Sequence, residues 1–204
     1  MLITKIFNVE SAHIVRNCTS ERCSHSIHGH SAVIEVTFEA KGLDNAQMVM
    51  DFGLMKNEIK SFIDGMDHCY LLCDRDKDEF RKFIKESCDR WIELPFNPSA
   101  EMLSMFIYYG ITKILESIKF SNGEKNVSVY SVKYHETKSG SATCFKGDMM
   151  DIWNPLVDKR GDFKINYSPA VVRDWNSPEM ENIFINGTDA VIFTDEIKQQ
   201  IKLY

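Results

Sequence analysis

Three histidines are spaced so that their imidazole rings could reach one metal ion. His28 and His30 flank Gly29 in the run Cys-Ser-His-Ser-Ile-His-Gly-His. Residues two apart on a strand point to the same face of a sheet, and the glycine lets a partner backbone approach closely. His13 ends a neighbouring alternating segment, on the side of its apolar residues, and antiparallel pairing would bring it beside the other two. Three neutral imidazoles leave the fourth coordination position of zinc open, as in catalytic sites.

Two alternatives to a catalytic zinc site stay open for these residues. A His-x-His pair on its own is often an incidental feature of a protein surface. Cys18 and Cys23 could also bind a structural zinc ion. The histidine that completes such a site would be His25 or His28.

Two further positions carry groups that can move protons or hold a planar ligand. Asp67 and His68 directly follow a predicted helix, and an aspartate beside a histidine can orient and polarise a base. Taken on its own, the pair is better explained as a helix end with a histidine favoured by the helix dipole. Glu136 ends a predicted strand, where its carboxylate could accept two parallel N–H bonds from a heterocycle. A glutamate at such a hairpin end is more often only solvated.

The elements that position these residues are indicated by the hydrophobic period. Alternation predicts strands at 2–14, 28–39, 126–136 and 142–146. Helical spacing predicts helices at 50–66 and after Pro98, with Asp51 at the start of the first and Ser99 as the cap of the second. The charged segment 74–93 fits a short helix or a packed insertion. This order is an α+β pattern, with an antiparallel sheet on one side and helices on the other.

Composition restricts the possible partners. The 204 residues are 44% hydrophobic and 26% charged, and the formal net charge is -6. This charge argues against nucleic acid as the main partner, and no apolar run approaches the roughly 20 residues of a membrane helix. The first residues read directly into a strand, without the pattern of a signal peptide. We therefore expect a cytoplasmic protein whose six cysteines are reduced thiols.

The last quarter of the chain differs from the rest. Residues 150–204 contain three of the five prolines and seven aromatic residues. So much aromatic surface predicts a segment that is folded against something else rather than a flexible tail. We expect a core domain at 1–149 and an extension at 150–204 that packs on it, with a role that the sequence does not reveal.

Six segments occur in one order along the first 140 residues. They are Phe7 to His13, the run from Cys23 to His30, Val49-Met50-Asp51-Phe52 with Lys56, Asp67-His68, Asn97-Pro98-Ser99-Ala100-Glu101, and Glu136-Thr137. Their types, order and approximate spacing resemble the 6-pyruvoyltetrahydropterin synthase family, which includes the bacterial 6-carboxytetrahydropterin synthases of queuosine biosynthesis. The resemblance covers residues 1 to 147.

This resemblance implies the tunnelling (T-) fold. In that fold a four-stranded antiparallel sheet carries two helices on one face. Subunits join their sheets into an oligomeric barrel, and the active sites lie at subunit interfaces. The resemblance therefore implies a homo-oligomer, a hexamer or a tetramer.

The resemblance also implies roles for particular residues. The implied Zn²⁺ ligands are His13, His28 and His30. The implied proton-transfer residues are the thiol base Cys23 and its relay partners Asp67, His68 and Glu136. The implied substrate contacts are Glu136, as the pterin anchor, and Glu101.

Two positions depart from the family pattern. In bacterial members the cysteine usually lies four residues before the first histidine of His-Gly-His, and here Ser24 occupies that position. Cys23 lies five residues before it. Ser99 stands where the family usually has the threonine of Pro-Thr-x-Glu.

The implied substrate is 7,8-dihydroneopterin triphosphate, a small molecule. In the carboxy-forming branch, zinc-dependent chemistry removes triphosphate and cleaves the side chain, giving 6-carboxytetrahydropterin and acetaldehyde. The composition, rich in lysine, isoleucine and phenylalanine, favours this bacterial branch. The alternatives are a pyruvoyl-forming synthase, which cleaves no carbon-carbon bond, and a non-catalytic relative that binds zinc or pterin. We expect neither a nucleic acid nor a membrane as partner.

Overall fold

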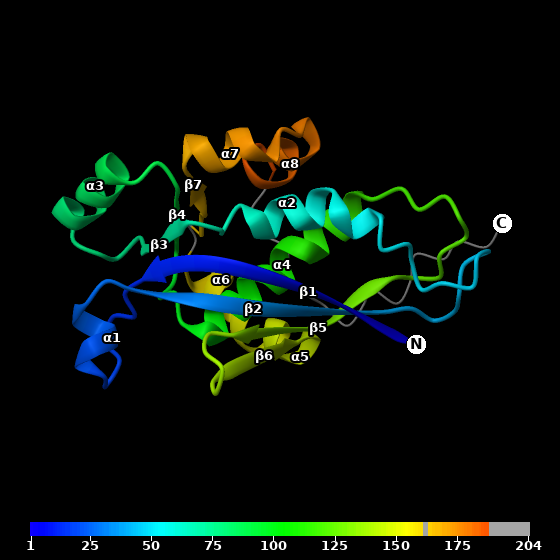
Figure 1. Cartoon of the computed structure of the whole chain (residues 1–204), viewed down its shortest axis with the longest axis horizontal. Helices are drawn as coiled ribbons and strands as arrows, with labels where there is room; N and C mark the ends of the chain where they lie inside the picture. The colour runs from blue at the N-terminus through cyan, green and yellow to red at the C-terminus, as the bar shows by residue number, and fades with distance from the viewer. Residues whose placement is uncertain (161–162, 188–204) are drawn as a thin grey trace.

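The computed structural model describes residues 1–160 and 163–187, and their strands form one mixed sheet. The strand order across the sheet is β6-β5-β2-β1-β3-β4-β7 (Figure 1). The strands that alternation predicts are β1 (Leu2–His13), β2 (His28–Glu39), β5 (Ser128–His135) and β6 (Ser141–Phe145). All four are confirmed, and they pair antiparallel to one another.

The prediction of a four-stranded antiparallel sheet is wrong, because the described residues add three strands. These are β3 (Cys69–Cys73), β4 (Trp91–Leu94) and β7 (Asn166–Tyr167). β3 pairs parallel with β1, β4 pairs parallel with β3, and β7 pairs antiparallel with β4. Every residue of β3 is buried, so its sequence shows no alternation to detect. The charged segment between β3 and β4 does contain a helix, α3 (Asp78–Ser87).

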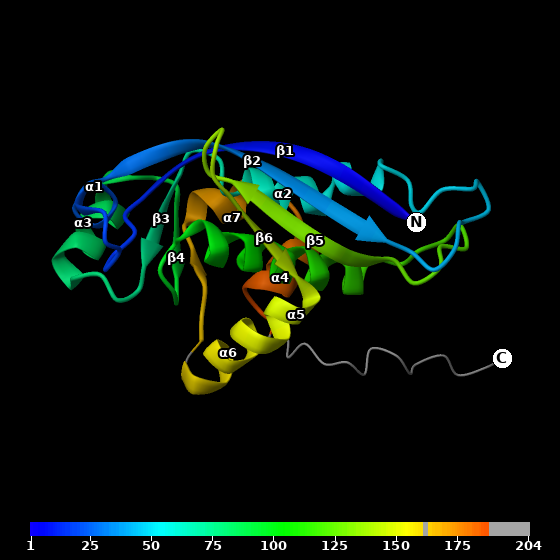
Figure 2. The same ribbon diagram turned by 90° about the horizontal axis from the view of Figure 1, so that it is seen from below.

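Two main helices cover one face of the antiparallel strands. α2 (Glu58–Asp64) and α4 (Ala100–Ser117) lie together under β1, β2 and β5 (Figure 2). We call this side, which bears Val9 and Ala32, the covered face. The opposite side, which bears Glu10 and Ser31, is the open face. Among the described residues, every helix is too short or too polar to span a bilayer.

The sequence predicts the start of α4 correctly but places the start of α2 too early. Ser99 caps α4 as predicted, since its hydroxyl accepts a hydrogen bond from the Met102 amide at 3.4 Å. The first helix begins later than predicted, after a 3₁₀ turn at Leu54–Lys56. Asp51 does not cap it, because the carboxylate accepts from the Gly53 amide at 2.6 Å and closes a turn ahead of the helix.

Short helices complete the described chain. α1 (Glu21–His25) lies between β1 and β2. After β6 come α5 (Lys146–Asp148), a π-helical turn (Met149–Trp153), α6 (Asn154–Arg160), α7 (Pro169–Trp175) and α8 (Pro178–Phe184).

Aromatic contacts join the described part of the predicted extension to the helices. The Trp153 ring stacks on Tyr109 with 5.1 Å between centroids, and Phe184 stacks on Phe62 at 4.9 Å. Residues 161–162 and 188–204 of the predicted extension lie outside the described residues. The described aromatic side chains at 153, 163, 167, 175 and 184 are all buried.

A glycine allows α2 and α4 to approach closely. A Cβ atom at Gly110 would lie 2.1 Å from Cζ of Phe62, a distance at which the atoms overlap. Phe62 is 2% exposed and also contacts Phe106, so its ring has little room to move away. The packing of the two helices therefore depends on the missing side chain.

We expect Gly110→Ala to destabilise the protein by about 1–3 kcal/mol, as overpacking usually does. The higher helix propensity of alanine, worth about 1 kcal/mol, would offset only part of this cost. Urea unfolding gives the free energy of both proteins. Gly147→Ala is the control, because a Cβ atom there meets nothing within 4 Å. Equal stability of the two variants would contradict the packing described here.

Candidate metal centre

The pairing of β1 with β2 brings three histidines together on the covered face. His13 lies opposite His28, and His30 follows two residues later on the same face. Their ring centroids are separated by 4.6 to 5.2 Å. One nitrogen from each ring lies within 4.8 Å of the others, a spacing that suits a shared metal ion.

Backbone carbonyl groups fix two of these rings. Nδ1 of His13 lies 2.8 Å from the carbonyl oxygen of Pro98, and Nδ1 of His28 lies 3.0 Å from that of Ser26. A carbonyl can only accept, so each Nδ1 carries the proton and donates it. This tautomer leaves Nε2 with a free lone pair, which is the arrangement of metal-binding histidines.

The Nε2 atoms show that the residues fit a metal. Nε2 of His13 and Nε2 of His30 are both buried, and neither has a hydrogen-bond partner among the described residues. A buried polar atom without a partner is unfavourable, and native proteins rarely keep one without a reason. A metal ion between the rings would satisfy both atoms.

The environment keeps His13 neutral. The residue is 2% exposed, and burial lowers the pKa of its imidazole to about 4, with a further contribution from the neighbouring His28. The hydrogen bond to Pro98 opposes this shift only in part. At neutral pH the ring is therefore uncharged, which is the form that binds a metal ion.

Glu136 borders the three histidines. It directly follows β5, and its Oε1 lies 3.7 Å from Nε2 of His13 and 3.8 Å from Nε2 of His30. Both distances exceed a normal hydrogen bond. The carboxylate thus places negative charge next to the centre without occupying the lone pairs of the rings.

Helix α1 carries Cys23 next to the strand ends that hold His13 and His28. The Val15 amide donates to the Cys23 carbonyl at 2.9 Å, and this bond ties the helix to the segment that follows β1. Cys23 is a half-buried free thiol. Ser24, which occupies the family's usual cysteine position, is buried and donates its hydroxyl to the Ser20 carbonyl.

The alternative of a structural zinc site with Cys18 and Cys23 receives no support. Across residues 1–160 and 163–187, the three histidines are the one group of at least three potential ligands that converges on a point. Both cysteines are free thiols outside that group.

Asp67 and His68 lie apart from the histidines, in the turn between α2 and β3. Oδ1 of Asp67 accepts from the Glu10 amide at 2.8 Å, and the His68 amide donates to the Glu10 carbonyl at 2.6 Å. The His68 side chain is 77% exposed, and Nε2 lies 3.7 Å from Oδ2 of Asp67.

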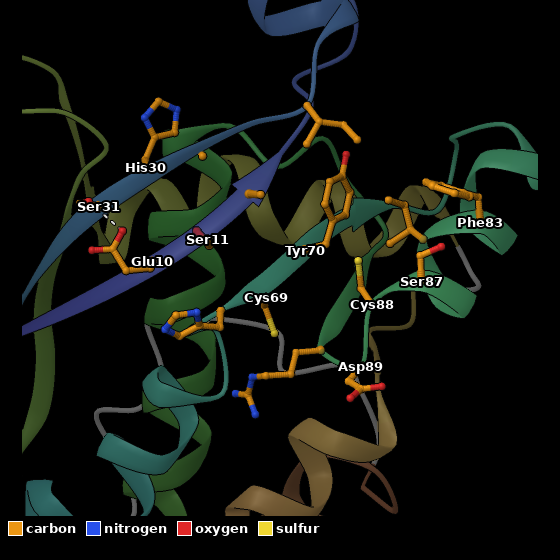
Figure 3. Close-up of a pocket in the computed structure, with 16 residues that line it drawn as sticks. Glu10, Ser11, His30, Ser31, Cys69, Tyr70, Phe83, Ser87, Cys88 and Asp89 are labelled. Carbon is orange, nitrogen blue, oxygen red and sulfur yellow. Dashed lines mark hydrogen bonds between the residues drawn. The ribbon is translucent and has the colours of Figure 1, made fainter.

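His68 lines a groove of about 760 Å³ together with Glu10 and Ser31 of the open face and with His30 of the candidate metal centre. Figure 3 shows Glu10 and Ser31 on this groove, joined by a hydrogen bond of 2.7 Å, and Cys69 and Tyr70 line it as well. Glu10 and Ser31 point away from the covered face that bears the histidines. Of the three histidines, His30 alone lines this groove with His68, and Asp67 is not among the lining residues. Glu101 is exposed in the first turn of α4.

Sequence reasoning missed the groups that hold the functional side chains. The carbonyls of Ser26 and Pro98 fix the imidazole tautomers, and Arg90 contacts the turn of Asp67. Backbone carbonyls carry no sequence signal, although Pro98 lies in a segment that the family resemblance singles out. Nothing near Arg90 in the sequence indicates its contact.

The fold is that of an enzyme family named for the synthesis of a tetrahydropterin. A family model described as 6-pyruvoyl tetrahydropterin synthase matches residues 2–147, and the chain belongs to this family. A solved structure of an uncharacterized protein from Wolinella succinogenes has the same fold, with a TM-score of 0.57 and 20% identity over 71% of this chain and 97% of that one. The 6-pyruvoyl tetrahydropterin synthase of Caenorhabditis elegans gives a TM-score of 0.50 and 19% identity, over 71% and 94% of the two chains.

More similar relatives carry a narrower name. A protein of Helicobacter pylori strain J99 named 6-carboxy-5,6,7,8-tetrahydropterin synthase is 36% identical over 202 residues, which are 98% of this chain and 100% of the relative. A protein of the same name from Aquifex aeolicus is 32% identical over 146 residues, covering 62% of this chain and 88% of the relative. The Helicobacter protein therefore matches well beyond residue 147, where the family model ends.

We expect His28→Ala to lose most of the bound metal, because two remaining imidazoles cannot close the site. Elemental analysis after dialysis against a weak chelator measures the metal content per chain. His25→Ala is the control, since this nearby histidine contacts Ser24 and lies outside the cluster. Full metal content in His28→Ala, or an empty site in Cys23→Ala, would contradict the ligand assignment.

Proposed function

We propose that the chain is a zinc-dependent 6-carboxy-5,6,7,8-tetrahydropterin synthase, a carbon-carbon lyase that acts on 7,8-dihydroneopterin triphosphate. The observation that carries this proposal is the 36% identity to the Helicobacter pylori synthase over nearly the full length of both chains. The products would be 6-carboxytetrahydropterin, acetaldehyde and triphosphate, for use in 7-deazapurine (queuosine) synthesis.

The proposed metal is Zn²⁺, held by His13, His28 and His30. A set of neutral imidazole nitrogens suits zinc and leaves one coordination position for substrate. When bound, zinc would supply Lewis-acid chemistry, which lowers the pKa of a substrate hydroxyl and stabilises negative charge on the side chain. Glu136 beside the centre would add to the attraction for a divalent cation.

The proposed proton-transfer residues are Cys23, as a thiol base, and the Asp67–His68 pair, as its relay. The His68 side chain is 77% exposed on an open groove, and we propose that the pair serves the metal centre of a neighbouring subunit. The exposed apolar side chains of Leu2 and Ile6 on the open face support an assembly. β6 ends the sheet of the described chain, and its outer edge offers backbone groups for pairing with another copy. The proposed assembly is a hexamer or tetramer built as a barrel.

The proposed substrate anchors are the carboxylates of Glu136 and Glu101. A carboxylate can accept two parallel N–H bonds from the edge of a pterin ring, and such charged bonds are worth more than neutral ones. Glu136 in its position next to the histidines could also take part in proton transfer.

We interpret residues 1–149 as the catalytic T-fold domain and residues 150–204 as an extension packed on it. The family match ends at residue 147, close to the proposed boundary. The stacking of Trp153 on Tyr109 and of Phe184 on Phe62 supports the packing.

Product analysis distinguishes the proposal from its alternatives. We expect purified protein to consume 7,8-dihydroneopterin triphosphate and to release acetaldehyde and 6-carboxytetrahydropterin in a ratio near one. Chromatography of the pterins and an aldehyde assay measure both. A 6-pyruvoyl product without acetaldehyde would instead identify the pyruvoyl-forming reaction. Binding of pterin without turnover would identify a non-catalytic relative.

We expect Cys23→Ala to lower kcat by about 10²–10⁴-fold, the usual contribution of a general base, while zinc remains bound. Steady-state kinetics and elemental analysis on the same sample separate the two effects. Cys18→Ala is the matched control, because it removes a nearby free thiol that the proposal leaves unused. An unchanged rate in Cys23→Ala would exclude the proposed base.

A further inference from the structure

One arginine binds the turn that carries Asp67 and His68. Nε of Arg90 donates to the Asp67 carbonyl at 2.8 Å, and Nη2 donates to the carbonyls of Asp64 and Gly65 at 3.0 and 3.3 Å. These carbonyls belong to the end of α2 and to the turn that follows it. Helix ends leave such carbonyls without partners, and the planar guanidinium can bond several of them at once.

The turn needs this support because its backbone is strained at His68. The φ angle of His68 is +54°, in the left-handed region that residues with a Cβ atom disfavour. Glu10 holds one side of the turn through the Asp67 carboxylate and the His68 amide. Arg90 holds the other side through the Asp67 carbonyl. The peptide group that joins Asp67 to His68 is thus fixed from both directions.

The C-terminal segment reaches the same arginine. Nη1 of Arg90 forms an ion pair with the carboxylate of Asp174 on α7. Helix α7 contacts α2, and Figure 1 shows the two helices side by side. A Cβ atom at Gly65 would lie 2.9 Å from Nε1 of Trp175, so α7 packs directly on the turn. The Arg90 side chain is only 20% exposed, so its contacts hold it in one position instead of leaving it free in water.

We propose that Arg90 is a positioning residue for the Asp67–His68 pair, and that Asp174 holds Arg90 in place. This inference rests on the proposed function, in which the pair moves protons. Asp174 lies beyond residue 147, where the family match ends. In this proposal the segment after the family core stabilises the active site. Its residue Asp174 holds Arg90, which fixes the turn of Asp67 and His68 that serves a neighbouring subunit.

Kinetics of the holoenzyme test the proposal. We expect Arg90→Ala to lower kcat by about 10–100-fold, the scale of a misplaced catalytic group, with KM changed less than about threefold. Arg90→Lys should have a kcat between those of Arg90→Ala and the native protein, because an ammonium group cannot reproduce the planar set of N–H donors of the guanidinium group. Asp174→Asn should lower kcat by about 3–10-fold and cause no further loss in Arg90→Ala, as expected for two residues that act together. Zinc content should stay unchanged in all three.

Hydrogen exchange tests the same contact without turnover. We expect the amides of residues 64–68 to exchange faster in Arg90→Ala, while β1 and β2 keep the protection of the native protein. Arg173→Ala is the control, because this exposed arginine approaches Asp174 only to 4.0 Å.

Two results would overturn the inference. One is an Arg90→Ala protein whose kcat and exchange equal those of Arg173→Ala. The other is faster exchange throughout the sheet with loss of zinc, which would make Arg90 a general stabilising residue. If the native protein consumes no substrate, the proposed function fails, and hydrogen exchange still decides whether Arg90 holds the turn.

Discussion

The register between β1 and β2 is the constraint on which the candidate metal centre depends. Side chains alternate between the two faces of a strand, so a shift of one residue in either strand would move its histidines to the other face. Buried residues such as Val9 and Ala32, which pair across the two strands, prevent this shift because the reverse arrangement would expose them. The same apolar pattern that packs the sheet on α4 therefore also aligns His13 with His28 and His30.

Burial and backbone carbonyls then convert three aligned histidines into a candidate ligand set. A solvated imidazole would be partly protonated near neutral pH, whereas the pKa of His13 is lowered to about 4 by burial. The Pro98 carbonyl, just ahead of α4, selects the tautomer of His13. In the proposed assembly, the Asp67–His68 pair of one subunit serves the metal centre of its neighbour. In that arrangement the extension contributes through Asp174 and Arg90, at a distance from the metal.

Sequence patterns predicted the part of the fold that is amphipathic. Alternation revealed β1, β2, β5 and β6, because each has one buried and one open face, and the Ser99 cap marked the start of α4. β3 and β4 were not predicted, because strands buried on both faces show no alternation. β7 was not predicted either, because it has only two residues. At the site, the grouping of three histidines could be anticipated from His-x-His and one alternating strand. The contact of Arg90 with Asp174 could not, since it joins residues 84 apart through side chains alone.

X-ray absorption at the zinc edge tests the central claim most directly, since it reports the atoms bound to the metal in the intact protein. Zinc-loaded protein is expected to show a shell of nitrogen and oxygen atoms at about 2.0–2.1 Å, with the outer-shell scattering of three imidazole rings and no sulfur. A zinc–sulfur distance of about 2.3 Å would show that a cysteine binds the metal. That result would contradict a centre made by the register of β1 and β2.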